Sequence, residues 1–121
     1  MTRAIRGSFL TFVAVIGLSA CSAASVIVDP GASRVVVGNQ PPPDGAQQLG
    51  GITAKHGHGC GLYGSEGNFE GAHALLRNKA AALGADYVQI VRVLEPGRFE
   101  GICNARDFVI DGVAYRTRSP H

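Results

Sequence analysis

The sequence predicts an α+β fold in which one amphipathic helix packs on a small, mainly antiparallel sheet, stapled by a disulfide. Apolar residues recur at intervals of three and four over residues 68–83, which is typical of a helix. Short β-branched stretches lie before and after that helix, separated by glycine-rich turns. A chain of 121 residues is long enough for one small domain.

The N-terminus has the features of a lipoprotein signal peptide over residues 1–20. Arg3 and Arg6 precede the apolar run SFLTFVAVIG, which is shorter than the roughly 20 residues that span a membrane. The following LSAC matches the lipobox of bacterial lipoproteins, so Cys21 is predicted to carry diacylglyceryl and N-acyl (palmitate) lipid. The alternative is an ordinary signal peptide with an incidental cysteine. Ser22, in place of an Asp, favours the outer membrane.

The charge gives no reason to expect a nucleic-acid partner. The chain has 11 basic and 9 acidic residues, and Arg3 and Arg6 leave with the signal, so the mature protein has nine of each. A near-neutral protein lacks the positive charge that nucleic-acid binding requires. The expected partners are the membrane, through the lipid anchor, and an unidentified envelope protein.

Cys60 and Cys103 remain once Cys21 is assigned to lipid. An even pair in an oxidising compartment favours a disulfide. It would close a loop of about 40 residues and stabilise the domain by about 4 kcal/mol in the chain-entropy model.

Residues 21–48 are predicted to form the lipidated N-terminus and a proline-rich tether. Pro41–Pro43 favour an extended polyproline II segment, and the preceding valines predict an early edge strand over residues 34–37. The small α+β domain is expected over residues 49–118.

Within this domain, residues 49–57 predict a strand weakened by glycine. Asn68 is suited to cap the helix that follows and Gly84 to end it. The apolar face of the helix consists of Phe69, Ala72, Leu76, Ala80 and Leu83. A strand is expected over residues 86–94. Residues 102–117 predict a last strand or a tight hairpin, with Asp111-Gly112 as a bulge or a turn.

The stretch ALLRNKAAALGADYVQI, residues 74–90, resembles small proteobacterial envelope lipoproteins. These are the family called domain of unknown function 4156 and, more distantly, the outer-membrane lipoprotein sensor of the Rcs envelope-stress phosphorelay. The resemblance extends over residues 34–116 and implies a lipid anchor and a disulfide-stabilised α+β domain without known enzymatic activity. These relatives carry cysteines before LG and near the C-terminus, where this chain has Gln47-Gln48 and Thr117. A specific partner or signalling role is therefore not carried over.

A lipid-anchored metal-binding protein is the alternative. His56, His58 and Cys60 occupy alternate positions, so in a strand they would share one face and could bind zinc or copper through the two histidines and a reduced Cys60. His73 or His121 could add a ligand, although His73 is expected to pack and His121 is terminal. The spacing lacks the Cys-x-x-Cys or His-x-x-x-His pattern of structural zinc sites. Cys60 also cannot be a thiolate ligand and a disulfide partner at once.

No catalytic residue is predicted, and the protein is expected not to be an enzyme. The carboxylates are scattered, and Ser65 lacks the Gly-x-Ser-x-Gly context of a nucleophile elbow. Arg77 is interpreted as an ion-pair partner and Asn78 as a hydrogen-bond partner of a loop backbone. Two alternatives stay open for the tyrosines, an exposed patch or caps on the core: Tyr63, Tyr87 and Tyr115. We expect an outer-membrane lipoprotein with a protein-binding, structural or stress-sensing role.

Overall fold

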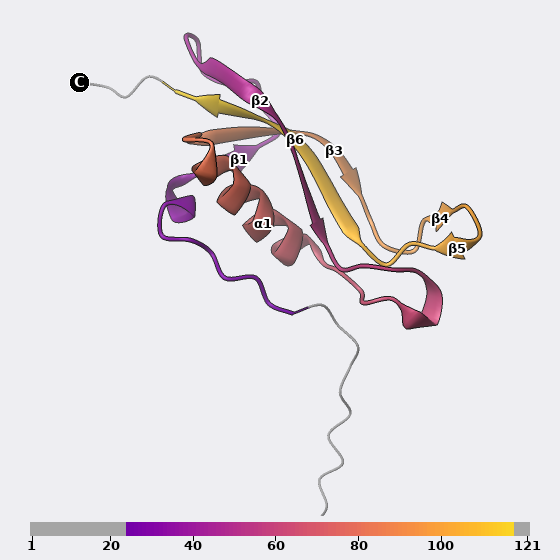
Figure 1. Cartoon of the computed structure of the whole chain (residues 1–121). Helices are drawn as coiled ribbons and strands as arrows, with labels where there is room; N and C mark the ends of the chain where they lie inside the picture. Colours follow the sequence, from indigo (N-terminus) through magenta and orange to yellow (C-terminus); the bar gives the residue numbers. More distant parts are fainter. Residues whose placement is uncertain (1–23, 118–121) are drawn as a thin grey trace, which may run out of the picture.

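The computed structural model describes residues 24–117, so the predicted signal peptide, Cys21 and His121 lie outside the described residues. Within the described part, four strands form one sheet in the order β1-β3-β6-β2 (Figure 1). Their bounds are Val36–Gly38 (β1), Gln47–His56 (β2), Tyr87–Leu94 (β3) and Phe108–Arg116 (β6). β6 pairs antiparallel with both β2 and β3, and β1 pairs parallel with β3. The predicted α+β fold with a mainly antiparallel sheet is confirmed.

The helix α1, Phe69–Ala82, lies across one face of this sheet (Figure 1). Its N-cap is Asn68, whose side-chain oxygen accepts a hydrogen bond from the Gly71 N–H at 2.8 Å. Gly84 follows the C-cap with a φ of 77°, which favours glycine. The sequence therefore predicted the helix and both of its ends to within a residue.

The core lies between α1 and the sheet. Leu76 from the helix, Val88 from β3 and Ile110 from β6 are its largest fully buried side chains. Ala72 and Ala80 on the same face of α1 are also buried, and such small residues let the helix approach the sheet closely. The ends of the predicted apolar face, Phe69 and Leu83, remain partly exposed.

The segment before β2 contributes to the fold, although the sequence indicated a tether there. A 3₁₀ turn, Ala32–Arg34, leads into β1, which forms close to the predicted early strand. Asn78 donates to the Ile27 carbonyl at 2.8 Å and accepts from the Asp29 N–H at 2.9 Å, as expected of a residue that binds a loop backbone. Arg77 binds the Ala32 and Ser33 carbonyls instead of an acidic side chain.

The last strand, β6, is continuous through Asp111-Gly112, so these residues do not form a hairpin turn. The irregularity lies on the neighbouring strand, because the register between β3 and β6 shifts between Ile90 and Arg92. Gly112 is required by close packing, since a Cβ there would lie 2.7 Å from Val88 Cγ1.

A short hairpin, β4 (Phe99–Glu100) and β5 (Cys103–Asn104), connects β3 to β6. Within residues 24–117 no helix has the length and apolar character of a membrane span.

Candidate functional site

One end of the molecule carries a structure that we call the disulfide tip, residues 57–67 and 95–107. The two loops leave the same end of the sheet, one after β2 and the other between β3 and β6 (Figure 1). The Cys60–Cys103 disulfide joins them with a Cα–Cα distance of 5.7 Å, which confirms the predicted pairing. A backbone bond from the Arg106 N–H to the Gly59 carbonyl, 3.1 Å, adds a second connection.

Ion pairs order the hairpin side of the disulfide tip. The Arg98 guanidinium contacts Glu100 at 2.6 Å and Asp107 at 2.9 Å. Arg106 reaches across to Glu66 on the other loop at 3.3 Å. Both arginines of the tip thus pair with carboxylates of the tip.

Large apolar side chains nevertheless project from both loops into solvent. Their exposed fractions are 95% for Leu62, 99% for Tyr63, 73% for Phe99 and 97% for Ile102. Leu62 and Tyr63 belong to a 3₁₀ turn, Gly61–Tyr63, directly after Cys60. Phe99 and Ile102 belong to the hairpin that carries Cys103. The disulfide therefore brings two pairs of exposed apolar residues into one region of the surface.

His56 lies where β2 passes into the disulfide tip, and only 5% of its surface is exposed. Its Nδ1 accepts a hydrogen bond from the Asn68 N–H at 3.0 Å. Its Nε2 lies 2.8 Å from the Ala24 carbonyl oxygen, which can only accept. The two contacts together require the neutral tautomer with the proton on Nε2. His56 thus ties the start of the described chain and the start of α1 to the end of β2.

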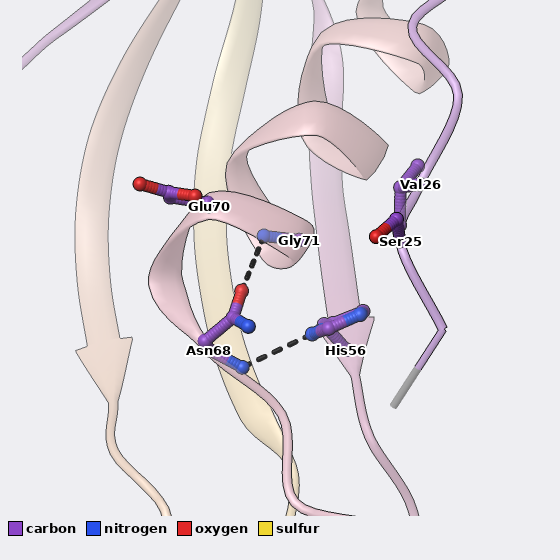
Figure 2. Close-up of a pocket in the computed structure, with 6 residues that line it drawn as sticks. All are labelled: Ser25, Val26, His56, Asn68, Glu70 and Gly71. Carbon is purple, nitrogen blue, oxygen red and sulfur yellow. Dashed lines mark hydrogen bonds between the residues drawn. The ribbon is translucent and has the colours of Figure 1, made fainter. Parts of the chain in front are cut away.

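These groups line a depression at the start of α1 (Figure 2). In the figure, Asn68 lies at the start of the helix, and His56 lies between Asn68 and the segment of Ser25 and Val26. The His56 ring packs against Gly71, where a Cβ would lie 2.3 Å from ring atoms. Both ring nitrogens of His56 bond to backbone groups of the fold. The depression is therefore a place where three segments of the chain are joined.

Two further titratable side chains, Asp111 and His73, interact with other groups of the fold. A hydrogen bond from the Thr53 hydroxyl and, next, one from Arg92 hold the pKa of Asp111 below its ordinary value. Burial and then the charge of Arg77 lower the pKa of His73. The His73 ring lies 5.3 Å from that of Phe69, so it packs near the apolar face as expected.

The chain matches the model of one protein family. The model of the family described as domain of unknown function (DUF4156) matches residues 26–116. The chain belongs to this family. Neither curated proteins nor solved structures gave a match. The likeness to DUF4156 proteins inferred from residues 74–90 is thereby confirmed, while that to the Rcs sensor stays a prediction. The match begins at Val26 and so includes the segment that packs on α1.

The residues proposed as metal ligands are separated in this DUF4156 domain. His56 is buried with both ring nitrogens bonded, His58 is exposed beyond it, and Cys60 is in the disulfide. Gly57, with a φ of 89°, interrupts the extended backbone that would have aligned the two histidines. Among residues 24–117 no three His, Cys, Asp or Glu side chains gather in a way that could hold a metal ion. A metal at His56 would have to displace one of its two hydrogen bonds.

The tyrosines of the DUF4156 domain do not form one patch. Tyr87 and Tyr115 are neighbours, with ring centroids 6.4 Å apart, on paired positions of β3 and β6. Tyr63 lies in the disulfide tip, at the other end of the sheet. The exposed positions of Leu62, Phe99 and Ile102 were not predicted from the sequence. In the sequence each is a single apolar residue within a turn-rich segment, and such a residue can equally well be buried.

Proposed function

We propose that this DUF4156 protein is an outer-membrane lipoprotein, anchored by lipid on Cys21, with a non-catalytic role in the cell envelope. Its folded domain would act by protein binding, as a structural component or in stress sensing. The Cys60–Cys103 disulfide carries this proposal. Structural disulfides persist in oxidising compartments outside the cytosol, and this one lies in the same chain as the lipobox LSAC.

A non-catalytic role is supported by what the polar side chains do. His56, Asp111 and Arg98 each bond to groups of the fold itself. A general base or acid must instead reach a proton of a bound substrate. The disulfide tip exposes four large apolar side chains, which suits binding more than chemistry.

The anchor is tested by labelling growing cells with an alkyne fatty acid. The mature chain should take up the label, and Cys21→Ser should lose it and leave the membrane fraction. The matched control is the double variant Cys60→Ser/Cys103→Ser, which lacks the other thiols and should keep the label. Label that survives Cys21→Ser would overturn the proposal.

A further inference from the structure

We propose that the disulfide tip is a membrane-contacting surface, whose apolar side chains insert into the interface of the same bilayer that holds the lipid of Cys21. This inference rests on the proposed lipidation of Cys21. It adds an orientation to the anchor: the disulfide tip faces the lipid, and the opposite end of the sheet points away from it.

The position of the chain start is the first argument. The Ala24 carbonyl is held 2.8 Å from His56 Nε2, and His56 is the last residue of β2 before the disulfide tip. Cys21 precedes Ala24 by three residues, which span at most about 11 Å even when fully extended. A lipid on Cys21 would therefore be tethered within that reach of the end of β2, where the disulfide tip begins.

The composition of the tip is the second argument. Leu62, Phe99 and Ile102 are aliphatic or aromatic hydrocarbon, and each is more than two-thirds exposed. Tyr63 combines an apolar ring with a hydroxyl, the combination that is enriched at the boundary between hydrocarbon and headgroups. The side chains come from two loops that the disulfide holds together, so they lie in the same region of the surface.

The charges of the tip indicate which lipid headgroups it should contact. Residues 57–67 and 95–107 contain two arginines and four acidic residues, and both arginines are in ion pairs. A basic patch that would recruit anionic headgroups is thus missing from the tip as described, and insertion should proceed on zwitterionic lipid. The apolar contact is small, but the anchor keeps its local concentration at the bilayer high, so little intrinsic affinity is needed. A soluble protein partner lacks such a tether to this particular end.

The chain contains no tryptophan, so a single introduced one reports on its own position. Tyr63→Trp places the probe on the tip. Val36→Trp, on β1 and 61% exposed, places the control at the opposite end, because Val36 pairs with Tyr87 at the start of β3. Each mature, full-length lipoprotein is reconstituted in phosphatidylcholine vesicles that contain brominated phosphatidylcholine, after mass spectrometry has established the lipid on Cys21.

We expect the bromolipid to quench Tyr63→Trp several-fold more strongly than Val36→Trp. Adding Leu62→Ser and Ile102→Ser to Tyr63→Trp should bring its quenching down toward the control. Equal, weak quenching of both probes on a lipidated chain overturns the membrane contact and leaves the proposed function standing. Crosslinks between two chains at the tip, found without quenching of the Tyr63→Trp probe, would show that a second copy covers the tip. That result also overturns the membrane contact and leaves the proposed function standing. A mature chain without lipid on Cys21 instead overturns the proposed function. The membrane contact of the tip is then rejected as well, because it assumes that lipid.

Discussion

The contact between Gly71 and His56 predicts that adding one methyl group to α1 destabilises the protein. Gly71→Ala would normally favour a helix by up to about 1 kcal/mol, because alanine is the better helix former. Here the new Cβ would lie 2.3 Å from Cγ and Nδ1 of His56, whereas ordinary contacts begin at 3.4 Å. The ring must therefore move by about 1 Å, and hydrogen bonds on two opposite sides resist that movement.

The magnitude follows from the two costs. Overpacking a buried site costs about 1–3 kcal/mol, and each hydrogen bond that the ring loses costs about 1 kcal/mol more. Against a helix gain of at most about 1 kcal/mol, Gly71→Ala should lower the free energy of unfolding by about 2–3 kcal/mol. In a His56→Ala background the obstacle is gone, and the same change should be neutral or stabilise the protein.

The assay is urea denaturation of four proteins, made without signal peptide in a Cys21→Ser background: the parent, each single variant and the double variant. The structure predicts opposite signs for Gly71→Ala in the two backgrounds, or at least a coupling free energy above about 1 kcal/mol. If Gly71→Ala stabilises the parent, or the two changes are additive, the packing of His56 on α1 described above is wrong.

Three further predictions concern the disulfide, a carboxylate and the histidines. Replacing Cys60 and Cys103 by serine should lower the free energy of unfolding by about 4 kcal/mol, since the bridge spans 43 positions; a loss below about 1 kcal/mol in urea denaturation would contradict the chain-entropy argument. Because the folded state lowers the pKa of Asp111, its contribution is complete above its ordinary value near 4 and is lost as the pH falls through the folded value. The stability difference between the parent and Asp111→Asn should therefore shrink in acid, and denaturation curves that keep it constant from about pH 7 to about pH 3 would refute the coupling. Calorimetric titration with zinc should give the same heat for the parent and for His56→Ala/His58→Ala, because His56 already has both nitrogens bonded; saturable heat found in the parent alone would restore the metal hypothesis.

Local sequence patterns were enough to predict α1 and the disulfide. The helix has its own cap, its own apolar period and its own stop at Gly84, all within 17 residues of sequence. The disulfide required only a count, because one of three cysteines is assigned to lipid. A helix can be predicted from its own residues, without knowledge of the rest of the fold, when its caps and apolar period lie within it.

The site around His56 could not be predicted in this way, because its partners are distant. Ala24 lies 32 positions away and Asn68 lies 12 positions away, so nothing in HGHGC distinguishes a bonded histidine from a ligand. The segment before β2 is a similar case. Its three prolines suggest a tether locally, but its bonds to Asn78 span 49 and 51 positions. Long-range backbone contacts of this kind leave no periodic pattern.

The place of β6 in the sheet has a consequence for how the chain acquires its structure. β6 is the last strand in sequence, yet it lies between β2 and β3, so the strand pairing of β2 depends on residues 108–116. A chain that emerges N-terminus first therefore lacks a closed sheet until its final strand arrives. Such a chain completes its fold late, through contacts between residues that are distant in the sequence. The fold is therefore completed by the C-terminal strand, whereas the proposed lipid attachment lies at the N-terminus.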